Sequence, residues 1–388
     1  MASIHKRLTP SGDTRWDVRY RDPNRVDRSK SFQRKSDAAR FAASVETDIN
    51  RGDWIDPTLG RETFGNWAEQ WLVTTYRLKP KTQEGYRSVL NHHLLPKLGN
   101  TPVRRIDLAT VSELLSELTQ DGAGAGTVGN IRGVLNLVLE QARRSGAIRT
   151  NPVADTKAPR KPHQEMVFLT AEEIIAVANE ITSPPIKTGG GEHRRRSFPE
   201  RGLLVRLAGF TGLRAGEITA LKVSALDLTT MRVHVLLAAS EAYGQLHVGP
   251  PKTWRRRSVP LPSGLAEDLA GHIRSMSLRD YVFTSSRGTP VRQSNFHARH
   301  FKPAALRAGL DPRTRFHDLR HSYAAMLIAQ GAHPRAIMER LGHSSIQVTL
   351  DTYGHLFPEL EAHLTDEIDR VYRRVQGGER TNRTLGIA

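Results

Sequence analysis

Two kinds of residue are scarce in this chain of 388 residues: cysteine is absent, and only 40 Asp and Glu stand against 57 Lys and Arg. The absence of cysteine excludes disulfides, thiolate catalysis and cysteine-based zinc sites, so covalent chemistry needs another nucleophile. The shortage of acid leaves a net charge of +17 and a pI near 10.5. The composition therefore predicts a polyanionic partner, with nucleic acid as the first candidate.

Long apolar segments are also missing from the sequence. No run approaches the roughly 20 apolar residues that cross a bilayer, and no Lys- and Arg-rich amphipathic segment dominates. The first ten residues, MASIHKRLTP, lack the apolar core of a signal peptide. We expect a cytoplasmic protein without a membrane partner.

The first domain is marked by alternating side chains in the stretch RWDVRYR at 15–21. Its apolar members point to one side, as in a half-buried strand. Turn signals at 10–13 and 22–24 bracket the stretch. The pattern predicts a three-stranded antiparallel sheet followed by a helix over 36–50.

The outer face of this predicted sheet carries Arg15, Arg19 and Arg21. Such a face either reads DNA or is an ordinary hydrated surface, and the segment alone favours neither reading.

Three apolar stripes of helical spacing follow between residues 62 and 152. Their members are Phe64, Trp67, Ala68, Trp71 and Leu72; Val111, Leu114, Leu115 and Leu118; and Val128, Ile131, Leu135, Val138 and Leu139. The stripes predict a compact all-helical domain. Between the first two, Lys79, Lys81 and Arg87 lie among few acids, as in helices that run along DNA phosphates. A hydrated helix face has the same composition.

A third domain opens at a capping box, Thr170 to Glu173, after a basic, proline-containing linker. Residues 183–200 predict an exposed loop. Its three glycines do not form a phosphate-binding loop, because no strand precedes them and no Gly-Lys-Ser/Thr follows.

Four stretches of the third domain each offer a group that binds phosphate or transfers a proton. They are TGLRAGEI at 211–218, PKTWRRRSVPL at 251–261, FHDLRHSYA at 316–324 and LGHSSIQVTLDTYGH at 341–355. Each is weak when taken alone.

In the first two stretches, Arg214 follows a glycine-containing turn, and Glu217 is placed to brace its guanidinium. An isolated surface ion pair is the alternative. Lys252 is expected on a hairpin between the strand-like segments LHVG and SVPLP, although most hairpin lysines only protect a sheet edge. The arginines at 255–257 suggest nonspecific phosphate contacts or solubility.

In the last two stretches, His317 and Arg320 share one face of a helix whose apolar residues face a core. His343 follows the helix-ending pair Leu341-Gly342, and Tyr353 stands ten residues beyond it. A lone tyrosine near a helix end is more often a core residue. No metal is expected, because metalloprotease spacing is missing and the nearby arginines repel cations. The histidines weighed for such a site are His317, His321, His343 and His355.

Taken together, these groups suit phosphoryl transfer through a covalent phosphotyrosine. A phenol, with a pKa of about 10, attacks well at neutral pH only when positive neighbours favour the phenolate and a base takes its proton. The planar fork of arginine binds two phosphate oxygens, and lysine can release a proton to a leaving oxygen.

The combination resembles the tyrosine recombinase family, specifically phage-type integrases with an N-terminal arm-binding domain, over nearly the whole chain. The catalytic positions of that family fall on Arg214, Lys252, His317, Arg320, His343 and Tyr353. The resemblance implies a multidomain fold, mainly α with small β-sheets. Its parts would be an arm-type DNA-binding domain (1–58) with a three-stranded sheet plus helix, a helical, SAM-like core-binding domain (62–155), a mixed α+β catalytic domain (165–376) and an unstructured tail (377–388).

The resemblance implies a site-specific DNA recombinase of a bacterial host cell, which integrates a phage or mobile element and excises it in the reverse direction. Tyr353 would form a 3′-phosphotyrosyl bond, and Lys252 would protonate the leaving 5′-hydroxyl. Arg214, Arg320 and His343 would stabilise the charge on phosphorus, while His317 would take the phenol proton. No cofactor and no metal are implied.

The implied partners are double-stranded DNA attachment sites and a homotetramer on DNA, with a host DNA-bending protein and a recombination directionality factor as accessory candidates. A C-terminal amphipathic stripe would dock on a neighbouring copy or on its own domain. Its members are Leu360, Leu364, Ile368, Val371 and Val375.

Two alternative functions stay open at this stage. A type IB topoisomerase shares the covalent chemistry but acts on a single duplex, and the arm-like sheet argues against it. A noncatalytic DNA-binding regulator derived from a recombinase would be expected to have lost part of the catalytic set.

Overall fold

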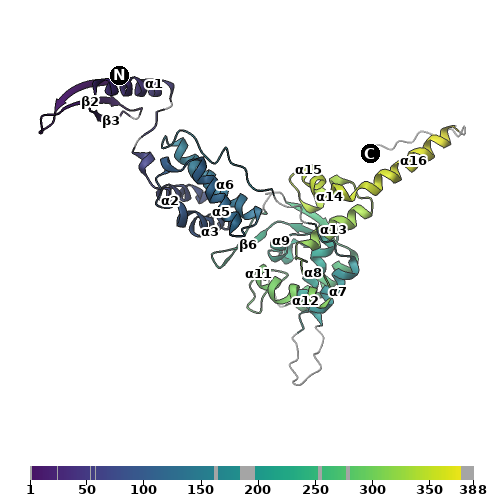
Figure 1. Ribbon diagram of the computed structural model, residues 1–388. Helices are drawn as coiled ribbons and strands as arrows, with labels where there is room; N and C mark the ends of the chain where they lie inside the picture. The colour runs from purple at the N-terminus through teal and green to yellow at the C-terminus, as the bar shows by residue number, and fades with distance from the viewer. Residues whose placement is uncertain are drawn as a thin grey trace. The chain divides into compact units, whose positions relative to one another are not determined.

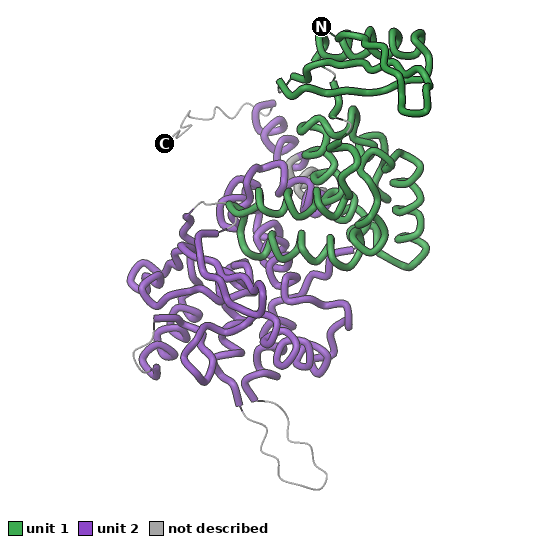
Figure 2. The backbone as a smooth tube through the Cα atoms, turned by 90° about the vertical axis from the view of Figure 1, so that its left-hand side faces the viewer, with its two compact units in different colours: residues 1–163 green, residues 164–388 purple. Residues whose placement is uncertain are grey.

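The structure is a computed structural model that describes residues 2–23, 25–52, 54–56, 58–160, 165–183, 197–251, 256–276 and 280–376, without the side chains of 358–364. The chain forms two compact units, residues 1–163 and 164–388 (Figure 1). Figure 2 shows the backbone of each unit in its own colour. Lys252, most of the predicted loop at 183–200 and the tail at 377–388 lie outside the described residues.

Unit 1 begins with a three-stranded antiparallel sheet in the order β1-β2-β3. The strands are β1 (Ser3–Leu8), β2 (Thr14–Arg21) and β3 (Asp27–Phe32). Helix α1 (Lys35–Arg51) covers one face, where a small core forms from Val18, Tyr20, Ala38, Ala42 and Val45. The predicted sheet is confirmed, and the helix exceeds its predicted bounds by one residue at each end.

The opposite face of this sheet carries the three arginines predicted on it, because side chains alternate along β2. The register places Arg19 between Ser3 and Ser29, and Arg21 opposite Asp27. Arg21 donates to Asp27 at 2.9 and 3.3 Å. Arg19 is exposed between its two short neighbours, so its guanidinium has room to reach outward.

The rest of unit 1 is helical, as the apolar stripes predicted. Its α-helices are α2 (Phe64–Thr74), α3 (Pro80–Val89), α4 (Leu95–Leu98), α5 (Leu108–Gln120) and α6 (Ala125–Arg144), with short 3-10 helices η1 (Leu59–Arg61), η2 (Thr75–Arg77) and η4 (Val103–Arg105) and a π-helical segment η3 (Leu90–Leu94). All three stripes lie in one buried core. Lys79, Lys81 and Arg87 are exposed in and beside α3, and Lys81 pairs with Glu84 at 2.8 Å.

Unit 2 surrounds one large core with helices and two small sheets. Its α-helices are α7 (Ala171–Thr182), α8 (Pro199–Thr211), α9 (Ala215–Thr219), α10 (Ser263–Ser275), α11 (Gln293–Phe296), α12 (Lys302–Arg307), α13 (Asp318–Ala329), α14 (Pro334–Leu341), α15 (Ile346–Tyr353) and α16 (Pro358–Gln376), with short 3-10 helices η5 (Val223–Ala225) and η7 (Gly354–Leu356) and a π-helical segment η6 (His297–Phe301). The predicted capping box is present, since Thr170 and Glu173 bond to each other's backbone N–H. The chain is thus multidomain and mainly α with small β-sheets, as expected.

The strands of unit 2 correct one expectation. They are β4 (Leu226–Asp227), β5 (Arg232–Val235), β6 (Ala238–Ala242), β7 (Gln245–Gly249) and β8 (Arg257–Pro260). β6 pairs with β7, whereas β8 pairs with β5, so the two strands that flank Lys252 belong to different sheets. The predicted hairpin is therefore wrong. Strand β7 ends at Gly249, directly before Pro250 and Pro251. Proline has no backbone N–H to donate to a neighbouring strand, so these two residues do not extend β7 towards β8.

Helix α16 leaves much of its apolar stripe in solvent. Ile368, Val371 and Val375 are more than half exposed, while the side chains of Leu360 and Leu364 are outside the description. Within the part of the chain that the structure describes, no helix is both long enough and apolar enough to cross a membrane.

Candidate active site

A tight helix end positions the first arginine of the site. Helix α8 ends at Gly212, whose φ of +64° lies in the left-handed region. A Cβ at this position would meet the side chain of Tyr323 at 2.5 Å and that of Leu341 at 2.8 Å. Only glycine fits at this position. Arg214 comes two residues later, directly before the first residue of α9.

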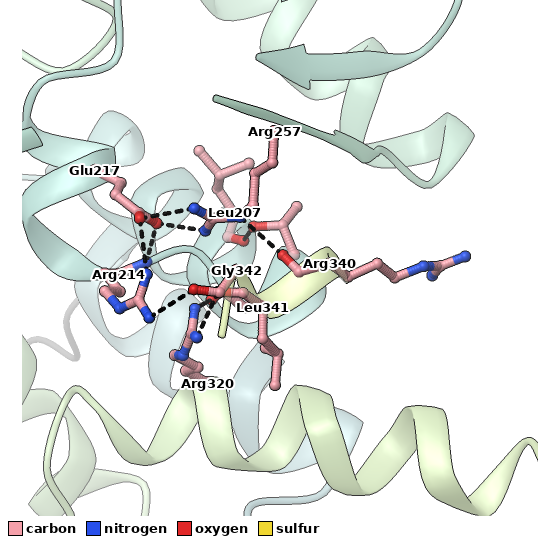
Figure 3. Close-up of polar contacts among 10 residues, drawn as sticks. Leu207, Arg214, Glu217, Arg257, Arg320, Arg340, Leu341 and Gly342 are labelled. Atoms are coloured by element: carbon pink, nitrogen blue, oxygen red, sulfur yellow. Dashed lines mark hydrogen bonds and ion pairs between the residues drawn. The ribbon is translucent and has the colours of Figure 1, made fainter. Parts of the chain in front are cut away.

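The carboxylate of Glu217 lies between two guanidiniums (Figure 3). Its Oε1 accepts from Arg214 Nη1 at 3.1 Å and from Arg257 Nη1 at 2.8 Å, and its Oε2 accepts from Arg257 Nη2 at 2.6 Å. Burial alone would raise the pKa of Glu217, but Arg257 and Arg214 hold it below its usual value. Glu217 is therefore a buried anion at neutral pH, and it fixes both arginines.

The second arginine of the site, Arg320, is only 3% exposed on α13. Its Nη1 donates to the carbonyl of Gly212 at 2.6 Å, and its Nη2 donates to that of Leu341 at 2.5 Å. Both carbonyls lie at the C-terminal ends of helices, where the partial charge is negative. Burial lowers the pKa of Arg320 to about 9, which still leaves it charged at neutral pH.

The end of α14 connects the whole network through three successive carbonyls (Figure 3). The carbonyl of Arg340 accepts from Arg257 Nε at 3.0 Å, that of Leu341 accepts from Arg320, and that of Gly342 accepts from Arg214 Nη2 at 3.2 Å. Gly342 has a φ of +66°, and a Cβ on it would lie 2.9 Å from Arg257 Cδ. This single turn therefore sets the spacing of the guanidiniums.

Tyr353, the last residue of α15, is 1% exposed. Its hydroxyl lies 2.9 Å from Nδ1 of His321, and its ring is nearly parallel to that of His343, with 6.3 Å between centroids. Burial raises the pKa of Tyr353, although the charges of Arg320 and Arg214 oppose the rise. The phenol is therefore protonated at rest, in the positive field of both arginines.

Two histidines complete the site as neutral groups. Burial, with Arg320, Arg214 and Arg257 nearby, lowers the pKa of His343 to about 4, and its Nδ1 lies 2.8 Å from Thr349 Oγ1. His317 is an exposed residue at the start of α13. The ring of His317 is partly desolvated and lies near Arg320 and Arg214, and both effects lower its pKa, to about 4. At neutral pH each of these imidazoles is therefore uncharged, with one nitrogen that can donate a hydrogen bond and one that can accept it.

The structure brings five of the six predicted site residues together: Arg214, His317, Arg320, His343 and Tyr353. Lys252 lies outside the described residues. The predicted brace between Glu217 and Arg214 is present. The arrangement offers two fixed cations and a phenol whose ring meets those of His343 and His321, which suits the binding of an anionic tetrahedral group.

Two further residues of the site were missed or misread from the sequence. Arg257 was expected to contact phosphates or aid solubility, but its side chain is 8% exposed and pairs with Glu217, so the role in solubility is wrong. The run of three arginines carries no signal that separates Arg257 from its neighbours. His321 was considered only as a metal ligand, because nothing in the spacing points to Tyr353.

Two family models match most of the chain. The model described as "Phage integrase family" matches residues 170–359, and the one described as "Phage integrase central domain" matches residues 64–159. Among curated relatives, the ICEBs1 integrase of Bacillus subtilis is 26% identical over 75% of this chain and 78% of its own length. The tyrosine recombinase XerC of Alcanivorax borkumensis is 26% identical over 79% of this chain and 92% of its own.

Solved structures share the fold. The Tn1549 transposon integrase in complex with transposon right end DNA has a TM-score of 0.65 at 19% identity, covering 75% of this chain and 95% of its own. A lambda integrase tetramer bound to a Holliday junction has a TM-score of 0.57 at 21% identity, covering 88% of this chain and 95% of its own.

Proposed function

The chain belongs to the phage integrase family and is a tyrosine recombinase, and from this premise we propose that it cuts and rejoins DNA through a covalent bond between Tyr353 and a 3′-phosphate. Its substrate is a pair of double-stranded attachment sites, one of them carried by a phage or other mobile element. No nucleotide cofactor is needed, because the phosphotyrosine conserves the energy of the broken bond.

One observation carries this proposal: three successive carbonyls at the end of α14 hold Arg257, Arg320 and Arg214. A guanidinium has five N–H donors, and those not taken by carbonyls or by Glu217 can bind phosphate oxygens. The two arginines whose charges also reach the Tyr353 hydroxyl are Arg320 and Arg214. A phosphate bound by them would lie beside the nucleophile.

Each remaining residue has a proposed role in cleavage. Arg214 and Arg320 stabilise the pentacoordinate phosphorus, and His343 donates a hydrogen bond to one of its oxygens. Lys252 protonates the 5′-oxygen as it leaves. By the family resemblance, His317 is the base that accepts the phenol proton, and it lies near Arg320 and Arg214.

The DNA-binding surfaces proposed in unit 1 are the arginine face of the N-terminal sheet and the exposed cations around α3. The residues are Arg15, Arg19, Arg21, Lys79, Lys81 and Arg87. The net charge of +17 favours association with DNA and makes the affinity depend on salt.

A suicide substrate tests the proposed chemistry. A nicked attachment site loses a short 5′-hydroxyl fragment after cleavage, so the covalent complex accumulates and is seen on a denaturing gel. The unaltered protein should form this complex, whereas Tyr353→Phe should bind the same DNA and form none. A covalent complex with Tyr353→Phe would contradict the proposal. Relaxation of a supercoiled plasmid that lacks attachment sites would instead favour the topoisomerase.

The exposed stripe of α16 supports docking on a second copy, since Ile368, Val371 and Val375 are not covered by the described part of their own chain. The related lambda integrase forms a tetramer on a Holliday junction, and we propose the same assembly here. Deleting 358–388 should weaken tetramer formation on paired sites, as measured by light scattering. Unchanged assembly would contradict the role of α16.

We also propose that the reaction takes place in the cytoplasm of a bacterial host, with a DNA-bending protein and a directionality factor as accessory partners. Recombination of purified protein with paired sites, with and without host extract, tests the need for them.

A further inference from the structure

The hydroxyl of Tyr353 meets a histidine that lies outside the six positions of the family pattern. Nδ1 of His321 is 2.9 Å from the Tyr353 oxygen, and the two rings meet edge to face with 5.8 Å between centroids. His321 belongs to α13 and Tyr353 ends α15, so the bond joins two helices. Tyr353 is 1% exposed, and His321 is half-buried. The contact is therefore held in place by the packing of α13 and α15.

The chemistry of this pair follows from its protonation. The phenol stays protonated at rest, so it becomes an effective nucleophile only if a base accepts its proton during attack. Burial lowers the pKa of His321, so this imidazole is neutral at pH 7 and has one nitrogen without a proton. When that nitrogen is Nδ1, the phenol donates to it, and the geometry for proton transfer is already in place.

The charged and titratable groups around His321 come from every element that meets it. Asp318 raises the pKa of His321, while Arg315 and Arg320 lower it. The ring of His317 packs perpendicular to it, with 4.9 Å between centroids, and His343 and Tyr353 approach it from the segment that includes α15. Burial and the two arginines together outweigh the single carboxylate, so the pKa of His321 lies below its usual value.

His317, which the family resemblance offers as the base, lies one ring further away. Its ring packs against His321, and the contacts of the described residues include none between His317 and the Tyr353 hydroxyl. The side chain at hydrogen-bond distance from the nucleophile is that of His321.

Resting on the proposed function, we propose that His321 is a further catalytic residue, which accepts the phenol proton of Tyr353 at Nδ1 during strand cleavage. The Tyr353 O–H bond breaks as its oxygen bonds to phosphorus, and the bond from phosphorus to the 5′-oxygen breaks on the opposite side. Lys252 gives that oxygen a proton. Ligation reverses each transfer, and His321 returns its proton to the phenol.

His321→Asn separates proton acceptance from positioning. The amide oxygen of asparagine falls near the place of Nδ1 and can still accept a hydrogen bond from Tyr353, but it is not a base at neutral pH. Single-turnover cleavage of the suicide substrate should fall on the order of 100-fold, and the part of the rate loss at acid pH that comes from protonation of His321 should be absent. His355→Asn, the same change at an exposed histidine of the same unit, should cleave normally.

A second comparison identifies which proton is affected. With a 5′-bridging sulfur in the substrate, the leaving group no longer needs a proton, so Lys252→Ala should recover while His321→Asn stays slow. Replacing Tyr353 with a fluorinated tyrosine lowers the pKa of the phenol, and the loss caused by His321→Asn should shrink. If His321→Asn does not fold, as judged by circular dichroism and DNA binding, His321→Gln takes its place.

The outcomes separate the two proposals. If the unaltered protein forms no covalent complex, the proposed function fails. If it does, and His321→Asn cleaves with the same rate and pH profile, only the role of His321 is overturned. Recovery of His321→Asn on the sulfur substrate would likewise overturn it, because His321 would then serve the leaving group.

Discussion

Arg257 and Glu217 form a buried pair, with two hydrogen bonds of 2.8 and 2.6 Å and side chains that are 8% and 2% exposed. The same carboxylate holds Arg214, and the same guanidinium reaches the carbonyl of Arg340. A residue on β8 thereby positions the arginine that precedes α9 and the turn after α14.

Arg257→Met should destabilise unit 2 by about 3 kcal/mol, because it leaves Glu217 buried with one cation fewer. Arg256→Met is the matched control, since Arg256 is exposed, and it should change the free energy of unfolding by about 0.5 kcal/mol or less. Chemical denaturation followed by circular dichroism measures both. Equal losses in the two variants would contradict the assigned role.

The turn at Gly342 provides a second test, with Gly331 as its control. Gly342 and Gly331 both have left-handed φ angles, +66° and +72°. A Cβ added at Gly342 would meet the side chain of Arg257, whereas a Cβ added at Gly331 would lie in open space. Gly331→Ala should cost about 1 kcal/mol from backbone strain. Gly342→Ala should cost about 1–3 kcal/mol more through crowding, and it should also slow cleavage. A normal cleavage rate in Gly342→Ala would show that the turn does not set the arginine spacing.

The sequence predicted what local patterns control. Alternation along β2, the helical stripes of α2, α5 and α6, and the Thr170 capping box each depend on neighbours within a few residues, and each is confirmed. The brace from Glu217 to Arg214 is of the same kind, since it spans three positions.

Contacts between distant segments were not predictable. β8 pairs with β5 across an inserted two-stranded ribbon, so adjacency of β7 and β8 in the chain misled the hairpin prediction. Arg257 lies in an arginine run that is typical of a hydrated surface, and only the fold buries it. The contact between His321 and Tyr353 joins two helices, and no spacing rule reports it.

The pH dependence of stability tests the neutral state of His343. The pKa of His343 falls from 6.5 to about 4 on folding. Between these two pH values, His343 is therefore protonated in the unfolded chain and neutral in the folded chain. The stabilisation is complete above pH 6.5 and is lost as the pH falls towards 4, by up to about 3 kcal/mol. Unfolding free energies at pH 7 and pH 4.5 should differ less in His343→Gln. An unchanged difference would contradict the assignment.

Two arginines of the N-terminal sheet should contribute unequally to DNA binding. Arg19 is exposed between two serines, whereas the fork of Arg21 is engaged by Asp27. Arg19→Ala should weaken binding to arm-type DNA, selected from a random pool, by about 1–3 kcal/mol. Arg21→Ala should lose less. Fluorescence anisotropy at fixed salt measures both, and a larger loss for Arg21→Ala would reverse the assignment.

Mass spectrometry of the trapped complex identifies the residue that becomes covalently bound to DNA, which we propose is Tyr353. Trypsin releases residues 341–370 as one peptide, in which Tyr353 is the only tyrosine. After nuclease digestion, the proposed phosphotyrosine predicts a nucleotide on this peptide, localised by fragmentation to Tyr353. A nucleotide on any other residue, with Tyr353 unmodified, would contradict it.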